Sequence, residues 1–160
     1  MPKWGYSFIE QKYDVDRLAK GSGRDLRLKP KHGREICAVI KGMQLDRAKR
    51  FLEDVIQLKQ SVPFRRHKKK QAHRKDLKQF KWYAGRYPQK AAAKIYEILS
   101  QVESNAEYKG LDIDLCRIIH AATQHGRIIK RYIERAHGRS SPRFKHLSHV
   151  EIVIYEFPGS

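Results

Sequence analysis

Positive charge is concentrated in two segments of the chain. Residues 61–90 contain eleven Lys and Arg side chains against one acid, and residues 127–146 contain seven against one. These two segments therefore carry +16 of the formal net charge of +18. Neither segment can line an apolar core, because burying an unpaired charge costs more free energy than the packing of that side chain contributes. The sequence predicts a nearly neutral body to which two cationic segments are attached.

This charge distribution favours a polyanionic partner. Repulsion among the cations destabilises a free globule, and a polyanion relieves that repulsion. Nucleic acid is the first expectation, and an acidic membrane surface is the second. The longest apolar run has five residues, 36–40, and the N-terminus lacks the apolar centre of a signal peptide. We therefore expect a soluble, intracellular protein without a membrane span.

The body has the size of one domain, residues 1–160, and three of its segments have helical periodicity. The first begins at Pro30 and stops at Gly42, with either Cys37 or Val39 on its buried side. The second covers 45–60 and ends before the next proline. The third follows Pro88 and ends at Gly110. Its apolar stripe consists of Ala91, Ile95, Ile98 or Leu99, Val102 and Ala106.

Three other segments favour strands. A Gly-Ser-Gly sequence at 21–23 predicts a flexible loop, and a short strand-like alternation at Leu26 and Leu28 follows it. Residues 115–123 and 149–157 have the β-branched composition of strands, and the second alternates between two faces. The order of these elements predicts an α+β fold with a small three-stranded antiparallel sheet packed on three helices.

Residues 126–148 join the last two strands and predict a long protruding β-hairpin. Gly138 lies near the middle of this segment, and His137 with Gly138 can supply the positive φ of a tight reversal. Each arm would hold about ten residues and project roughly 30 Å. A free two-stranded ribbon is marginally stable, so we expect a polyanion to order it. The side chains predicted to contact RNA here are Arg127, Lys130, Arg131, Arg135, His137, Arg139, Arg143 and Lys145.

Residues 64–84 have neither helical nor strand periodicity and predict a basic loop. A structureless loop of this length inside a domain indicates function or disorder. Aromatic residues alternate with the cations, which suits phosphate pairing combined with base stacking on RNA. RNA is favoured over DNA because no segment resembles a helix that reads a major groove. The side chains predicted to contact RNA in this loop and in the residues just after it are Arg65, Arg66, Lys68, Lys69, Lys70, Arg74, Lys75, Lys78, Lys81, Trp82, Arg86, Tyr87 and Lys90.

Other chemistries are less well supported. A metal-free ribonuclease could use a histidine pair as acid and base, but no pocket-forming sequence accompanies the histidines. A zinc site at His67 and His73 lacks a second ligand pair. The candidate catalytic histidines are His125, His137, His146 and His149.

Four further residues have simple structural interpretations. Asp112 and Asp114 suit a turn that leads into a strand better than a catalytic carboxylate pair. Cys37 and Cys116 lie far apart and predict buried thiols. We therefore expect no enzyme activity, no metal and no cofactor.

Several long motifs resemble a known family. The stretches GRYPQKAAAKIYEILSQVESNAEYKGLDID and KRYIERAHGRSSPRFKHLSHVEIVI are similar to family twenty-two of the large-subunit ribosomal proteins, called seventeen in eukaryotes. The resemblance extends upstream through GRDLRLKPKHGREICAVIKG and VPFRRH and covers about residues 20–156, leaving 1–19 as an N-terminal extension. WGYS and the insertion at 64–84 resemble the archaeal and eukaryotic branch.

This resemblance implies a structural constituent of the large ribosomal subunit in the cytoplasm. The body would bind large-subunit rRNA and support assembly, and the hairpin would line the nascent-peptide exit tunnel. Its partners would be rRNA, neighbouring large-subunit proteins and, near the tip, the nascent polypeptide, with no membrane. The implied tip residues are Arg135, Ala136, His137, Gly138 and Arg139. A free RNA chaperone or RNA-processing factor with the same basic segments is the alternative.

Two positions depart from the family pattern. The family often has proline where this chain has Glu134, and many archaeal members have Asn-Pro at Ser141 and Pro142. An acid beside RNA requires compensation, so we expect Glu134 to pair with Arg131 or Arg135.

Overall fold

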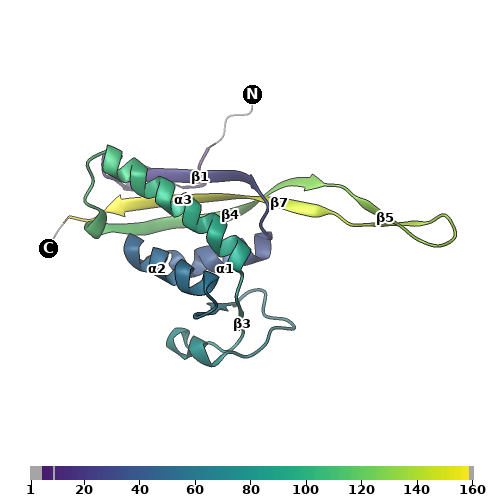
Figure 1. The fold of residues 1–160 in the computed structure, drawn as a ribbon. Coiled ribbons are helices and arrows are strands. Elements are labelled where there is room, and N and C mark those ends of the chain that lie inside the picture. The colour runs from purple at the N-terminus through teal and green to yellow at the C-terminus, as the bar shows by residue number, and fades with distance from the viewer. Residues whose placement is uncertain (1–4, 9, 159–160) are drawn as a thin grey trace.

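A computed structural model of the chain describes residues 5–8 and 10–158. Its centre is a three-stranded antiparallel sheet in the order β1 (Leu18–Leu26), β7 (Lys145–Glu156), β4 (Cys116–Ile129). Three helices, α1 (Pro30–Ile40), α2 (Leu45–Ile56) and α3 (Gln89–Tyr108), cover one face of this sheet (Figure 1). The predicted α+β architecture is confirmed.

The central strand β7 is buried on both faces. Val150, Ile152 and Ile154 belong to the core cluster beneath the helices, as their alternation predicts. Glu151 and Val153 alternate with them and are also buried. The strands predicted at 115–123 and 149–157 are both longer in the structure, because β4 and β7 continue past the body into the hairpin.

The helices agree with the periodicity of the sequence. Cys37, rather than Val39, is fully buried on α1, and both Ile98 and Leu99 are buried on α3. The second predicted helix is too long, because α2 ends at Ile56 and the next residues turn away through Leu58, which has a φ of 62° and is exposed.

The prediction of a flexible Gly-Ser-Gly loop is wrong. Gly21 and Gly23 lie inside β1 and pair with Ile152 and Val150 of β7. A Cβ atom on Gly21 would lie 2.4 Å from Val102 Cγ2 of α3. Glycine in a strand often marks a close approach of another segment. These glycines let α3 pack directly against the sheet.

The N-terminal segment covers part of the other face of the sheet. The backbone N–H of Ser7 donates to the Glu151 carboxylate, and His120 Nε2 lies 2.9 Å from the same group. The Tyr13 and Tyr155 rings contact each other at 5.3 Å. The predicted extension 1–19 includes residues 1–4 and 9, which lie outside the described residues, and its last two residues belong to β1.

The remaining elements are short. They are η1 (Glu10–Lys12), β2 (Val62–Pro63), η2 (Lys75–Phe80), β3 (Gly85–Arg86), η3 (Ile113–Leu115), β5 (Tyr132–Glu134) and β6 (Ser140–Pro142). In Figure 1 the hairpin formed by β5, β6 and the ends of β4 and β7 projects from one end of the sheet, beyond the helices. The region around β3 lies apart from it, beneath α1. None of the helices in the described part of the chain has the length and apolar composition that a bilayer span requires.

Candidate nucleic-acid interface

The basic loop, residues 64–84, is folded against the body, so the prediction of a structureless segment is wrong. β2 and β3 pair at its base, and inside it Arg74 N donates to Tyr83 O at 2.8 Å. Phe64, Leu77 and Ala84 are almost completely buried. These apolar residues are scattered among cations and have no period, which is why the sequence pattern does not reveal them.

A buried carboxylate on α1 holds the beginning of the basic loop. Glu35 is 3% exposed and accepts hydrogen bonds from the backbone N–H groups of Arg65 (3.0 Å), Arg66 (3.2 Å) and His67 (3.0 Å). Its Oε1 atom also lies 2.9 Å from His67 Nδ1. Hydrogen bonds to an ionised carboxylate are stronger than neutral ones. Glu35 therefore fixes three consecutive loop residues, while the Arg65 and Arg66 side chains remain exposed.

Sequence reasoning missed this role of Glu35. The available signal was an acid next to Ile36, on the side of an amphipathic helix that was predicted to be buried. A buried acid requires partners. Nothing in the sequence says that those partners are backbone groups 30 residues further on.

The single acid of residues 61–90 has a similar function. Asp76 Oδ2 accepts hydrogen bonds from Ser61 N at 2.6 Å and from Gln60 Nε2 at 3.3 Å. Leu77, the next residue, is fully buried. Both carboxylates are thus used to hold the backbone of the basic loop, and they do not cancel the charge on its outer surface.

The predicted RNA-contacting cations of this segment are all exposed. Several of them lie over aromatic rings: Arg65 and Lys68 are each 5.9 Å from the Trp82 ring, and Arg74 is 5.0 Å from the Tyr87 ring. Cation–π contacts of this kind hold the long side chains in place.

The aromatic residues of the loop differ in their availability to RNA. Phe64 is buried in the core, so it cannot stack on a base. Trp82 Nε1 donates to Phe64 O at 3.0 Å, and its ring stacks on Tyr83 with centroids 5.0 Å apart. Tyr83 is 45% exposed and presents the most open ring of this pair. Base stacking by Trp82 and Tyr87 stays a prediction.

The hairpin reverses where the sequence predicts. His137 and Gly138 have φ values of 57° and 64°, and Arg135 N donates to Arg139 O at 2.8 Å. Two consecutive residues with positive φ are typical of a tight hairpin turn. The predicted tip residues, 135–139, therefore lie at the distal end of the ribbon.

The hairpin cations are exposed, but they are not equivalent. Arg127, at the start of the hairpin, forms an ion pair with Asp25, with Nη2 and Oδ2 2.8 Å apart. The hydrogen bond from the Arg127 side chain holds the pKa of the Asp25 carboxyl below its usual value. Arg127 is therefore partly engaged within the protein, whereas Lys130 and Arg131 form no ion pair with any described residue.

The prediction that Glu134 pairs with Arg131 or Arg135 is wrong. Glu134 makes no ion pair within the described residues, and Arg135 Nε instead donates to Ser141 Oγ at 3.2 Å. The reason is the geometry of the ribbon, in which Glu134 pairs with Ser140 and is exposed to solvent. An exposed acid needs no internal partner.

A third group of cations, which we call the root cations, was missed by counting charge along the sequence. Its members follow β1 and are exposed: Arg27, Lys29, Lys31 and Arg34. The sheet register places the end of β1 beside the hairpin, since Leu26 pairs with Ser148. Ser148 Oγ also donates to Leu28 O at 3.1 Å.

The body is neutral in sum but not in space. Asp25 and Glu35, the two acids near the root cations, are both engaged inside the protein. The other end of the sheet, where Leu18 pairs with Tyr155, mixes the acids Asp14, Asp16, Asp112 and Asp114 with the exposed cations Arg17, Lys109 and Arg117. The basic surface therefore runs from the basic loop across the first half of α1 to the hairpin, and the far end is mixed in charge.

The histidines have ordinary contacts. His67 lies against Glu35, and the His73 ring packs on Tyr83 with centroids 4.9 Å apart. His149 Nδ1 accepts a hydrogen bond from Asp25 N at 3.0 Å. Among residues 5–8 and 10–158, no cluster of three or more His, Cys, Asp or Glu side chains could hold a metal ion.

The remaining sequence predictions concern thiols and acids. Cys37 and Cys116 are free and buried, as predicted, and burial raises the pKa of each thiol to about 11. The Asp112 side chain accepts from Asp114 N at 3.0 Å and caps η3, which confirms its predicted duty in a turn.

Comparison with known proteins identifies the family. The model of the family "Ribosomal protein L22p/L17e" matches residues 21–155. The chain is 47% identical to the large ribosomal subunit protein uL22 of Archaeoglobus fulgidus over 96% of its length and 97% of that protein. It is 48% identical to the uL22 protein of Methanopyrus kandleri, over 98% and 99%. The resemblance of the motifs agrees with these matches, and the chain belongs to the ribosomal protein L22p/L17e family.

Proposed function

We propose that this protein is a structural component of the large ribosomal subunit that binds large-subunit rRNA and has no enzymatic function. The observation that carries this proposal is the use of the local acids. Glu35 and Asp76 bind backbone groups of the basic loop, so the cations around them face outward without compensation. A surface of this kind suits a phosphate backbone, where Arg and Lys displace condensed counterions.

The three basic regions, which are the basic loop, the root cations and the hairpin, would bind RNA in different ways. The basic loop and the root cations are held by contacts within the folded body and would bind RNA without large rearrangement. The hairpin has little apolar support, because residues 127–140 are all exposed. RNA wrapped around it would supply the ordering free energy through charge-assisted hydrogen bonds. The protein thereby supports subunit assembly by holding RNA segments on both sides of α1.

The hairpin is also suited to line the nascent-peptide exit tunnel. It projects from the end of the sheet, and its tip, residues 135–139, lies far from the body (Figure 1). At this position the tip would meet the nascent polypeptide, while the body contacts rRNA and neighbouring large-subunit proteins. The protein would work in the cytoplasm within the assembled subunit.

Sedimentation tests the assembly role. Cell extract is fractionated on a sucrose gradient at physiological salt, and the protein is followed by immunoblotting. We expect it to sediment with large subunits and to be released only at high salt. Recovery in free fractions at the top of the gradient would instead favour the RNA chaperone or processing factor.

Cross-linking tests the position of the tip. A photoreactive group is attached to a His137→Cys variant, after replacement of both native cysteines by alanine. In ribosomes that hold a radiolabelled nascent chain, we expect an adduct between the variant and that chain. The same group placed at Gln101, on the exposed side of α3, should give none. Absence of the adduct at the tip would refute the tunnel position and leave rRNA binding intact.

A further inference from the structure

We propose that a cavity between α1 and the basic loop receives one unstacked nucleobase of the bound RNA. This inference rests on the proposed rRNA-binding function and assigns a base-specific contact to a surface that otherwise contacts phosphates. The cavity has a volume of about 320 Å³, at the small end of the range for ligand sites. A single planar ring system suits this size better than a larger ligand.

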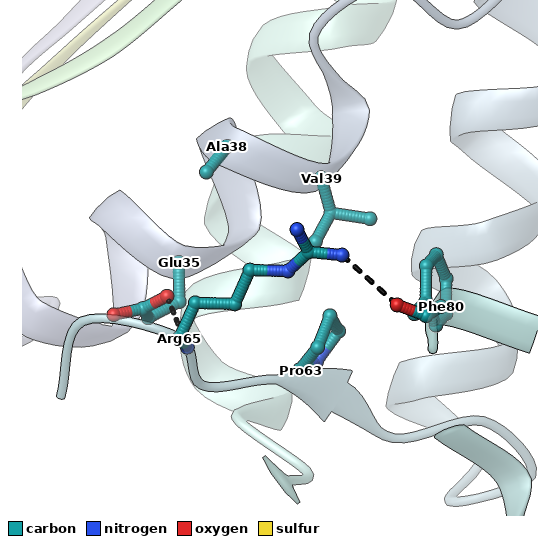
Figure 2. A pocket seen from close by; sticks show the side chains of 6 residues that line it. All are labelled: Glu35, Ala38, Val39, Pro63, Arg65 and Phe80. Atoms are coloured by element: carbon teal, nitrogen blue, oxygen red, sulfur yellow. Dashed lines mark hydrogen bonds between the residues drawn. The ribbon is translucent and has the colours of Figure 1, made fainter. Parts of the chain in front are cut away.

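The walls are mostly apolar. Ala38 and Val39 of α1 form one side, Pro63 lies opposite, and Phe80 closes one end (Figure 2). The Phe80 ring is held edge-on by Phe51, with centroids 6.0 Å apart. Apolar and aromatic walls suit the face of a base, and sequence-specific RNA recognition commonly uses bases that leave the stack.

Arg65 supplies the polar contact. Its side chain crosses the cavity, and Nη2 donates to Phe80 O at 3.0 Å (Figure 2). Its backbone N–H is held by Glu35 at 3.0 Å, so both ends of the residue are fixed. A guanidinium has five N–H donors in a rigid plane. The donors that Phe80 does not use are available to a base edge, and the plane itself can stack on a base.

The surroundings favour RNA over other occupants. Arg34 lies one turn before Ala38 on the same side of α1, and Arg66, Lys68 and Lys69 follow Arg65. All four are exposed and can bind the phosphates on either side of an inserted base. Glu35, the one acid that lines the cavity, already accepts from three backbone N–H groups. Its charge is therefore compensated by the protein.

The test separates base contacts from phosphate contacts by their salt dependence. Ala38 is exposed on α1, so Ala38→Trp can fill the cavity without disturbing the core. Binding of the full chain to deproteinised large-subunit rRNA is measured by filter retention over a KCl series, with excess transfer RNA as competitor. Loss of a stacked base typically weakens binding about 5- to 150-fold. We expect this loss with an unchanged slope of log K against log salt.

Matched variants control the interpretation. Gln101→Trp adds the same ring to the exposed side of α3 and should bind as the parent does. Lys69→Ala removes a phosphate contact and should reduce the salt slope by about 0.7 to 0.9. Phe80→Leu keeps an apolar side chain but removes the aromatic face, and it decides the question if Ala38→Trp does not fold.

Three outcomes would overturn the proposal. Unchanged affinity in both cavity variants would show that no base enters. A loss of affinity with a reduced slope would assign the effect to phosphates. Binding of guanosine or adenosine monophosphate alone to the cavity, at micromolar concentration, would show that the cavity takes a free nucleotide. Failure of the parent chain to bind rRNA above the competitor would instead refute the proposed function itself.

Discussion

Replacing Glu35 by glutamine should release the beginning of the basic loop. The carboxylate accepts from the N–H groups of Arg65, Arg66 and His67. Glutamine has one acceptor oxygen and one donor nitrogen, so at least one of these N–H groups loses its acceptor. The Glu35→Gln substitution also removes the negative charge that strengthens the remaining hydrogen bonds.

The magnitude follows from these hydrogen bonds. A donor left without a partner costs about 1–3 kcal/mol, and a bond to a charged group contributes about 1 kcal/mol more than a neutral one. We expect the free energy for opening this part of the loop to fall by about 2–3 kcal/mol. The protection factors of amides 65–67 should therefore fall roughly 30- to 150-fold.

Native-state hydrogen exchange measures this change directly. The matched control is Glu97→Gln, which removes an exposed carboxylate that pairs with Lys94 at 2.8 Å. An exposed pair of this kind contributes about 0.5 kcal/mol or less. The assigned role of Glu35 would be refuted if amides 65–67 exchanged at the same rates in Glu35→Gln and in the parent protein.

Three other changes have defined outcomes. Gly21→Ala places a Cβ 2.4 Å from Val102 Cγ2 and should lower the urea-unfolding free energy by about 1–3 kcal/mol; an unchanged midpoint would contradict the close packing of α3. Burial raises the pKa of Glu151, but hydrogen bonds from the N-terminal segment and β4 outweigh it, so the folded pKa lies below the ordinary 4.5. Its contribution to stability is full above pH 4.5 and is lost as pH falls through the lower folded value. Urea titrations should show this loss in the parent and a flatter profile in Glu151→Gln. The double variant His137→Ala with His149→Ala should match the parent in an RNA-cleavage assay, where neither cleaves; activity in the parent that the variant lacks would support the ribonuclease hypothesis.

Periodicity predicts the body because its core elements are regular. The stripe on α3 and the alternation on β7 each repeat often enough to identify a buried face. The reversal at His137 and Gly138 is also predictable, because few residue pairs adopt positive φ without strain. The helices, the sheet and the hairpin therefore follow from local sequence.

The errors arise where distant segments meet. Gly21 and Gly23 look like a flexible loop until α3 is placed against them. Leu77 is one apolar residue among cations, and only the folded chain shows that it fills a space beside Gly85. Glu35 is an unremarkable helical acid until the basic loop brings three N–H groups to it. Tertiary contacts of this kind have no period for a sequence pattern to detect.

Charge along the sequence is a good guide to function but an incomplete guide to the interface. The two basic segments are visible by counting, and both are exposed. The root cations are hidden in a count of charge because Asp25 and Glu35 flank them in the sequence. Only the structure shows that these two acids are engaged inside the protein, which leaves the cations to face outward.

The most direct measurement is hydrogen exchange of the hairpin in the free chain and in assembled large subunits. We expect amides of β5 and β6 to exchange fast in the free protein, while those of α3 are protected, because the ribbon has no core of its own. In assembled subunits the same hairpin amides should become strongly protected by bound RNA. Slow exchange throughout the hairpin without RNA, or no gain of protection on assembly, would contradict ordering by rRNA.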